Sequence, residues 1–128
     1  MNRTTKKEHI KNFKAIFHVN DEKRINIAIG NIVNLMKDIS PQIPDVELLI
    51  NGPAIILFKK KAILKQLLTL HRQGIRIVAC RNSINMYCKN NPDCPIAEDR
   101  LPTFIKVVSA GVSEIIIKQN MGYAYIKP

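Results

Sequence analysis

The sequence FKAIFHVND, residues 13–21, decides the fold class. Its first seven residues form a short apolar run rich in β-forming side chains, which is typical of a strand buried on both faces. Asn20 and Asp21 follow directly, and both residue types favour the N-cap of a helix. Apolar residues then recur at helical spacing up to about Ile39. The stretch therefore predicts a buried strand that leads straight into a helix.

The same alternation of strand and helix continues along the chain. Pro41 and Pro44 end the first helix, and Gly74 supplies a residue that tolerates left-handed backbone angles after the second. Short apolar runs predict further strands at 46–50, 75–79, 105–108 and 123–126, with helices at 22–39, 61–73, about 82–89 and about 109–120. Apolar strands alternating with helices are typical of a parallel sheet covered on both faces. The sequence therefore predicts an α/β fold: a three-layer α/β/α sandwich around a five-stranded, mostly parallel sheet.

The chain is long enough for one domain with one core. It has 128 residues, of which 46% are hydrophobic. Residues 13–128 are predicted to form this domain, and residues 1–12 are predicted to be a loosely held basic arm. The first twenty residues contain no apolar signal-peptide segment, and no apolar run approaches the roughly 20 residues that cross a bilayer. We therefore expect a cytoplasmic protein that does not enter a membrane.

The charge of the protein is strongly positive. Twenty Lys and Arg side chains against ten Asp and Glu give a net charge of +10. Residues 48–92 contain eight basic side chains and no acidic one, so we expect a positive field that attracts anions and lowers the pKa of a nearby thiol. Nucleic-acid binding has the necessary charge, but the sequence lacks stacking aromatics and any known DNA-binding motif. Nucleic acid is therefore only a secondary expectation as a partner.

Ligands of open parallel sheets bind beyond the carboxyl ends of the strands. The predicted strands place the following residues there: His18, Asn20, Asn51, Gly52, Cys80, Arg81, Asn82 and Ser109. Cys80 is the one strong nucleophile among them. The start of the following helix and Arg81 favour its thiolate form, so we expect its pKa to lie below the free value of about 8.5. The alternative is that Cys80 packs as a small hydrophobic side chain, and His18 is either a structural group or an aid to proton transfer.

The remaining cysteines and motifs point to no further chemistry. Three cysteines are an odd number in a chain that needs no disulfides to fold, so reduced thiols are predicted. Cys80, Cys88 and Cys94 lack the close pairs that structural zinc sites need, so no metal is predicted. Cys88 is expected to pack against the sheet, whereas Cys94 is either incidental or a resolving thiol. The nucleotide-binding glycine motifs are missing, so no cofactor is predicted.

Six segments together resemble one protein family. They are AIFHVND at 15–21, Asn34-Leu35, the run 46–52, ACRNS at 79–83, SAGVSE at 109–114 and the closing segment 119–128. In this order they resemble the DsrE/DsrF-like family over about residues 13–128. The resemblance implies a compact α/β/α domain that assembles into trimers or hexamers. It also implies a sulfur carrier in which one cysteine, here Cys80, accepts sulfane sulfur as a persulfide and passes it to a partner protein.

The leading hypothesis is therefore a sulfurtransferase-like carrier that uses a Cys80 persulfide, with sulfur donor and acceptor proteins as partners. In this hypothesis Arg81 stabilises the thiolate, and Asn51, Asn82 and Ser109 donate hydrogen bonds. The alternative is a non-catalytic oligomeric module that binds a small anion or a nucleotide at the cationic strand ends. The two differ in that the binding module needs no thiol.

Overall fold

Five parallel strands form the central sheet of the protein, for which a computed structural model describes residues 12–128. The sheet has the strand order β4-β3-β2-β1-β5, and all four neighbouring pairs are parallel. The strands are β1 (Lys14–Val19), β2 (Asp45–Ile50), β3 (Arg76–Cys80), β4 (Ile105–Val108) and β5 (Ala124–Ile126). The predicted α/β fold with five strands is confirmed. The predicted basic arm, residues 1–12, lies outside the described residues except for Asn12.

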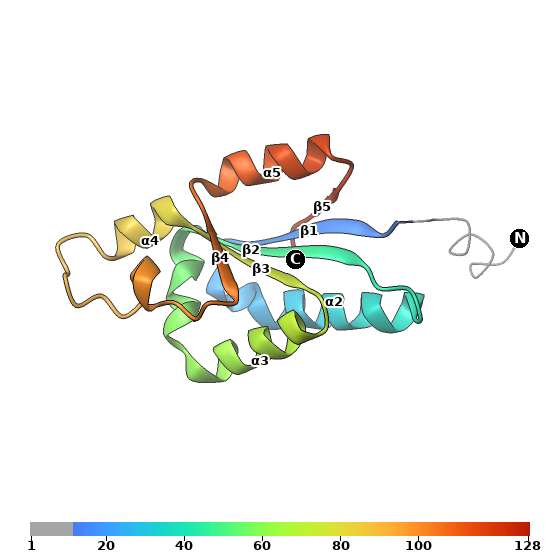
Figure 1. Cartoon of the computed structure of the whole chain (residues 1–128), viewed down its shortest axis with the longest axis horizontal. Helices are drawn as coiled ribbons and strands as arrows, with labels where there is room; N and C mark the ends of the chain where they lie inside the picture. The colour runs from blue at the N-terminus through green and yellow to red at the C-terminus, as the bar shows by residue number, and fades with distance from the viewer. Residues whose placement is uncertain (1–11) are drawn as a thin grey trace, which may run out of the picture.

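Helices cover both faces of this sheet, which makes the three layers. The long helices α2 (Ile25–Ile39) and α3 (Lys61–Arg72) lie on one face, and α5 (Gly111–Asn120) lies on the other (Figure 1). The short helix α4 (Arg81–Tyr87) continues directly from β3. Three 3-10 segments complete the chain: η1 (Glu22–Arg24), η2 (Gly52–Lys59) and η3 (Glu98–Arg100). None of the helices within residues 12–128 is both long and apolar enough to cross a membrane.

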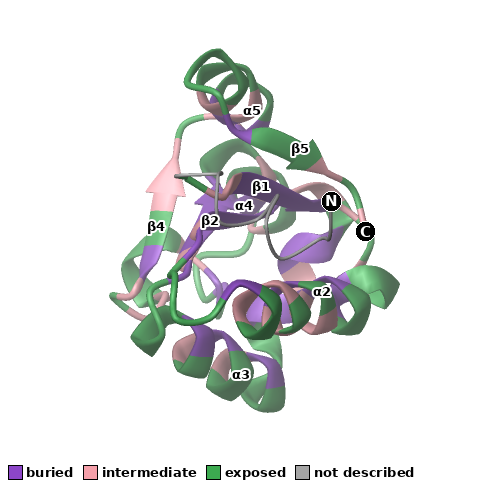
Figure 2. Cartoon of the chain, turned by 90° about the vertical axis from the view of Figure 1, so that its right-hand side faces the viewer, coloured by how far each residue is buried: buried purple, intermediate pink, exposed green. Residues whose placement is uncertain are grey.

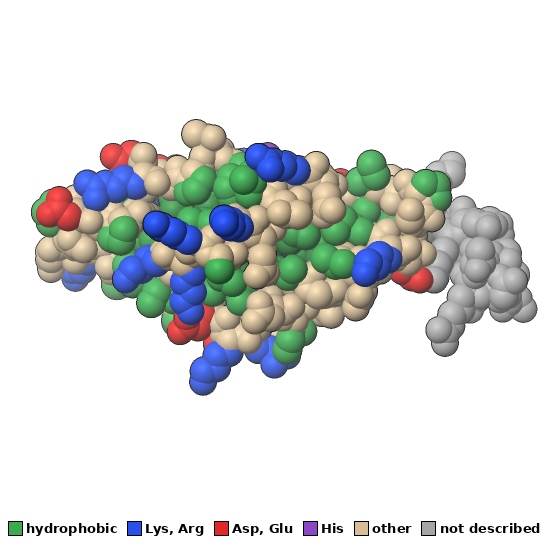
Figure 3. All heavy atoms as spheres, turned by 90° about the horizontal axis from the view of Figure 1, so that it is seen from below, with side chains coloured by type: hydrophobic (Ala, Val, Ile, Leu, Met, Phe, Trp, Pro, Cys, Tyr) green, Lys and Arg blue, Asp and Glu red, His purple; other side chains and the backbone are tan. Residues whose placement is uncertain are grey.

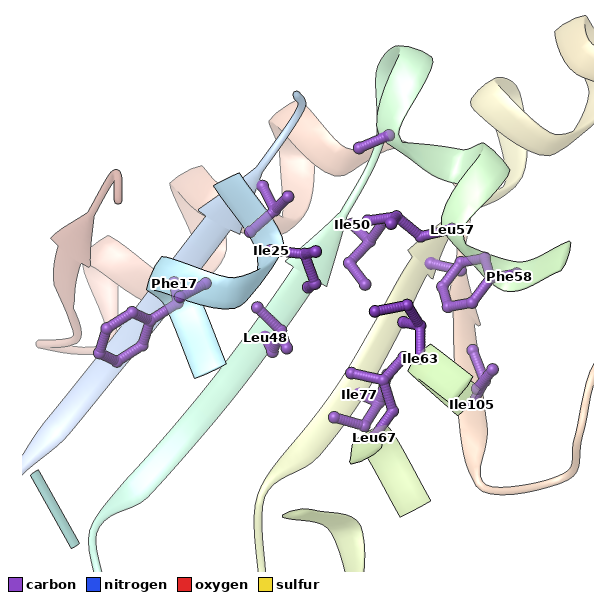
Figure 4. Packing of buried hydrophobic residues seen from close by; sticks show 14 of the residues in the cluster. Phe17, Ile25, Leu48, Ile50, Leu57, Phe58, Ile63, Leu67, Ile77 and Ile105 are labelled. Atoms are coloured by element: carbon purple, nitrogen blue, oxygen red, sulfur yellow. The ribbon is translucent and has the colours of Figure 1, made fainter. Parts of the chain in front are cut away.

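The main core lies between the sheet and the pair α2 and α3. Figure 2 shows the buried residues concentrated on the strands and on the helix faces turned toward them. Ile77 points from the sheet toward Ile63 and Leu67 of α3, and Leu48 belongs to the same cluster (Figure 4). Leu48 and Leu67 are completely buried. Each such side chain contributes about 1.5 to 3 kcal/mol through burial, so this face supplies most of the hydrophobic stabilisation.

The opposite face, under α5, has a much smaller apolar cluster. It is made by Ile16, Leu49, Val78 and Tyr123, with Val108 and Ile115 packed against them. Because strand side chains alternate between the two faces, Cys80 lies on the same face as Val78, which is two residues before it. The candidate thiol is therefore on the α5 side of the sheet.

The strands differ from prediction at the two edges of the sheet. All five were expected to be buried on both faces, but every residue of β5 is partly or fully exposed, and only Ile105 of β4 is buried. Each edge strand has one neighbour in the sheet, so less of it is covered. A smaller difference concerns β3, which begins and ends one residue later than predicted. Cys80 is thus the last residue of the strand and not the first after it.

The prediction of three reduced cysteines is wrong, because Cys88 and Cys94 form a disulfide. The loop between them doubles back through Asn90, whose φ of 62° is left-handed, and through a hydrogen bond from the Asn91 N–H to the Cys88 carbonyl. This turn brings the two Cα atoms to 5.3 Å, a separation that a disulfide spans. Cys80 is the free cysteine of the described residues. Within residues 12–128, no three His, Cys, Asp or Glu side chains gather into a metal site.

Candidate functional site

Cys80 lies where the carboxyl ends of three neighbouring strands meet. It pairs with Val108, the last residue of β4, while Ala79 pairs with Ile50, the last residue of β2. The segments that follow these strands therefore surround its sulfur atom. Asn51 and Gly52 come from the end of β2, and the start of α5 comes from the end of β4.

Uncharged hydrogen-bond donors surround the Cys80 sulfur. The N–H of Gly111 donates to Sγ at 3.3 Å, and the hydroxyl of Ser83 also bonds the sulfur. The Ser83 oxygen accepts a hydrogen bond from the Gly52 N–H at 2.7 Å. Because its oxygen is occupied by that donor, the Ser83 hydroxyl is oriented with its own proton toward Cys80.

These donors favour the thiolate form of Cys80. Burial raises its pKa, but the hydroxyl and N–H of Ser83 and the N–H groups of Gly111 and Asn82 outweigh that effect. The net result is a pKa below the ordinary value for cysteine, as the sequence predicted. The N–H groups of Asn82 and Ser83 belong to the helix start that was predicted to favour the thiolate, whereas the Ser83 hydroxyl and the Gly111 N–H take the place that was predicted for the Arg81 side chain.

His18 fixes the position of Asn51 beside this site. Its Nε2 lies 2.7 Å from Asn51 Oδ1, and its Nδ1 lies 2.6 Å from the Tyr125 hydroxyl. An amide oxygen only accepts hydrogen bonds, so Nε2 carries the proton, and in the neutral ring Nδ1 accepts from Tyr125. Both nitrogens of the buried ring are thus bonded within the protein, and the ring holds the Asn51 side chain in one orientation.

Asn51 in turn closes the space next to Gly111. A Cβ atom added at Gly111 would lie 2.7 Å from Asn51 Nδ2 and 3.4 Å from the Asn51 Cβ and Cγ. Only glycine therefore fits where the backbone brings its N–H to the Cys80 sulfur. Gly52 meets a different requirement, because its φ of +57° is left-handed, a backbone conformation that glycine adopts readily.

The other predicted site residues lie at the same edge of the sheet but point elsewhere. Arg81 is exposed and donates to the Glu98 carboxylate from Nε at 2.7 Å and from Nη2 at 3.4 Å. Asn82 and Ser109 are exposed as side chains, and Asn82 reaches the sulfur through its backbone N–H. The Arg81 guanidinium is therefore already paired with Glu98. It is a weaker candidate for stabilising the Cys80 thiolate than Ser83 and Gly111.

Much of the positive charge of residues 48–92 lies on the far side of the sheet from Cys80. Lys61, Lys65 and Arg72 are exposed on α3, which covers the face opposite to α5. Figure 3 views the molecule from the α2 and α3 side and shows Lys and Arg side chains spread among apolar ones. These three charges are therefore separated from the Cys80 sulfur by the sheet.

The sulfur is buried but lies close to a pocket. Cys80 is 5% exposed. An apolar pocket of about 430 Å³ is lined by Gly52 and Ser83, which connect to the sulfur, and by Asn82, Met86 and Tyr87 among others. Ser83 therefore lies between the pocket and the thiol.

Three important residues of the site were not among those predicted. Ser83 lies in the first turn of the helix after Cys80, where a hydroxyl can reach back toward the strand end. Gly111 opens the helix after β4, and Tyr125 belongs to an edge strand that is distant in sequence from His18. The first two positions carried a local signal in the polar run 80–83 and the small-residue run 109–111. The bond between Tyr125 and His18 depends on strand order, which a single sequence does not reveal.

Comparisons with known proteins agree with this fold. The sequence matches the DsrE/DsrF-like family over residues 12–128. The structure is similar to that of MTH1491, a protein of unknown function from Methanobacterium thermoautotrophicum, with a TM-score of 0.74 and 28% sequence identity. The match covers 91% of this chain and 100% of that one. No curated protein matches the sequence. Because the family match extends over the whole described fold, the chain belongs to the DsrE/DsrF-like family.

Proposed function

We propose that this protein carries sulfane sulfur as a persulfide on Cys80. The observation that supports this most directly is the set of donors from Ser83 and Gly111 that lowers the pKa of the one free thiol. Proteins of the DsrE/DsrF-like family generally act in sulfur relay, which agrees with a thiol of this kind.

The proposed exchange balances without a metal or a redox cofactor. The Cys80 thiolate attacks the outer sulfur of a donor persulfide, R–S–SH, and the donor leaves as R–S⁻ while Cys80 becomes Cys80–S–SH. An acceptor thiolate then attacks the outer sulfur of that group, and Cys80 leaves as a thiolate. Donors that stabilise the Cys80 anion make it the better leaving group in the second step.

The pocket beside Ser83 is the proposed route for the reactants. Its apolar walls include Met86 and Tyr87, both of which are exposed. Burial of the thiol then protects the persulfide from water and oxidants between the two steps, since only a reactant that displaces Ser83 reaches the sulfur. The oriented hydroxyl of Ser83 serves both as a donor and as the barrier.

Mass spectrometry of the intact protein tests the proposal. After exposure to a low-molecular-weight persulfide, the protein is expected to gain about 32 Da, the mass of one sulfur atom. Cys80→Ser should lose this adduct completely. The double variant Cys88→Ser with Cys94→Ser is the matched control, because it keeps Cys80 as the one cysteine, and it should gain the same mass. Sulfur uptake by Cys80→Ser, or none by the wild type and the control, contradicts the proposal.

We also propose that the protein forms a homo-oligomer through the outer face of α5. Members of the family generally oligomerise. The apolar residues Val112, Ile116, Ile117 and Met121 are 51 to 65% exposed along this helix, and such a group of exposed apolar side chains marks an interaction surface.

Sedimentation of a charged variant tests the oligomer. Replacing Ile116 and Ile117 together with aspartate should reduce the assembly to monomers, because two carboxylates would have to be buried in the interface. Gln66→Asp on the exposed side of α3 is the control and should leave the mass unchanged. A wild-type chain that sediments as a monomer contradicts this part of the proposal.

A further inference from the structure

Two carboxylates are buried together beneath α5. Glu47 comes from the middle strand β2, and Glu114 comes from the first turn of α5. Their side chains are only 2% and 9% exposed. In both residues the Oε2 atom is buried without a hydrogen-bond donor from the described part of the chain. A buried acceptor without a donor is costly, so the arrangement requires a physical explanation.

The two carboxyl groups lie within hydrogen-bonding reach of each other. As two carboxylates they only accept, and their facing oxygens repel. A single proton turns one of the two carboxyl groups into a donor to the other. Burial, together with the hydrogen bond and negative charge of Glu114, raises the pKa of Glu47 to about 7.

Neighbouring positive groups weaken the repulsion between the two carboxylates, but none of them donates a hydrogen bond to Glu47 Oε2 or Glu114 Oε2. Lys118 Nζ lies 3.8 Å from Glu47 Oε1 and 3.9 Å from Glu114 Oε2, and Arg76 Nε lies 3.7 Å from Glu47 Oε1. Arg76 is mainly engaged by Asp45, which also accepts a 2.6 Å hydrogen bond from the Tyr123 hydroxyl. The charged and titratable groups around the pair are therefore Asp45 from β2, Arg76 from β3, Lys118 from α5, Tyr123 from before β5 and Lys14 from β1.

Few apolar residues lie between α5 and the sheet. Among the helices of residues 12–128, α5 alone lies on this face of the sheet (Figure 1), and the apolar cluster beneath it is small. Glu114 lies three residues after Gly111, whose N–H donates to the Cys80 sulfur. Any loosening of the first turn of α5 at Glu114 therefore also moves the donor at Gly111.

We propose that Glu47 and Glu114 share one proton that fastens the first turn of α5 to the sheet, and that both are positioning residues for Cys80 through the Gly111 N–H. When the pH rises, the proton leaves for solvent, two buried carboxylates face each other, and the first turn of α5 loosens. The role of the shared proton in holding α5 does not depend on the proposed function, whereas the positioning of Cys80 rests on the proposed function.

The sign of the pH dependence follows from the direction of the shift. The folded protein holds a proton on the pair at pH values at which the unfolded chain has already released it. This contribution to stability is complete below pH 4.5, the ordinary pKa of glutamate, and is lost as the pH rises through about 7.

Thermal unfolding between pH 5.5 and 8.5 tests the shared proton. In Glu114→Gln the amide N–H donates to Glu47 at every pH, so the variant should lose less stability than the wild type over this range. We expect the difference in the change of Tm to be about 5 °C or more. Glu22→Gln, at an exposed acid paired with Lys60, is the control and should follow the wild type. If Glu114→Gln folds poorly, Glu47→Gln provides the same test. Parallel curves for the wild type and the Gln variants overturn the proposal.

Hydrogen exchange tests the link to Cys80. After correction for intrinsic rates, protection of the amides at 111–114 in the wild type should fall about tenfold between pH 6 and 8.5. Glu114→Gln should keep its protection, and equal losses in both proteins overturn the positioning role. Neither measurement uses a sulfur donor. If the protein shows the expected hydrogen exchange but takes up no sulfur, the proposed function is contradicted, whereas the proposal of a proton shared by Glu47 and Glu114 still stands.

Discussion

Replacing Gly111 with alanine is expected to destabilise the protein by about 2 to 3 kcal/mol and to raise the pKa of the Cys80 thiol. The added Cβ would lie 2.7 Å from Asn51 Nδ2. Asn51 has little freedom to move away, because His18 Nε2 holds its side-chain oxygen at 2.7 Å. The backbone of Gly111 must therefore shift, and its N–H then withdraws from the sulfur that it bonds at 3.3 Å.

Gly30→Ala is the matched control for this change. Gly30 lies inside α2, and a Cβ added there meets nothing within 4 Å. Alanine should therefore stabilise the protein by about 0.5 to 1 kcal/mol, through its better helix propensity. Urea denaturation of the two variants measures these opposite signs. If Gly111→Ala is as stable as the wild type, the close contact with Asn51 does not constrain the site.

Ser83→Ala should reduce the thiolate fraction of Cys80 near neutral pH about tenfold, which corresponds to a rise of about one unit in its pKa. The Ser83 hydroxyl is the strongest of the groups that lower this pKa. Its removal also leaves the Gly52 N–H without the partner that it has at 2.7 Å. The pH dependence of alkylation by iodoacetamide reports the change, because only the thiolate reacts.

The pH profile of alkylation distinguishes a change in the pKa of Cys80 from a change in how easily a reagent reaches its sulfur. The midpoint of the profile gives the pKa, and the plateau at high pH gives the rate at which a reagent reaches the thiolate. With the hydroxyl removed, the midpoint should rise, and the plateau should rise as well, because Ser83 lies between the pocket and the sulfur. Ser113→Ala on the exposed side of α5 is the control and should change neither. An unchanged midpoint in Ser83→Ala contradicts the role of Ser83 as a donor.

Local patterns were enough to predict the architecture around Cys80. Short apolar runs, helical periodicity and glycine or proline at the ends of elements are properties of neighbouring residues. They located all five strands and the position of Cys80 at the end of β3 to within one residue. The family resemblance, which extended over the same segments, agreed with that placement.

The surroundings of Cys80 were predicted less well, because part of them is built from residues that are distant in sequence. Arg81 is next to Cys80 in the chain and was expected to stabilise its thiolate, but Glu98 binds its guanidinium. Gly111 is far from Cys80 in the chain and donates to its sulfur. The disulfide between Cys88 and Cys94 was missed because it depends on how the intervening turn folds back.

The sequence by itself determined the alternation of elements, the apolar faces of the strands and the position of one reactive residue, Cys80, at the ligand-binding edge of a parallel sheet. These features follow from backbone propensity and hydrophobic spacing, which act over a few residues. Only the tertiary structure decided that Gly111, which follows β4, donates to the Cys80 sulfur and that Glu47 meets Glu114 beneath α5. Such contacts form when β4, β3 and β2 become neighbours, since strand order brings together groups that no local pattern connects.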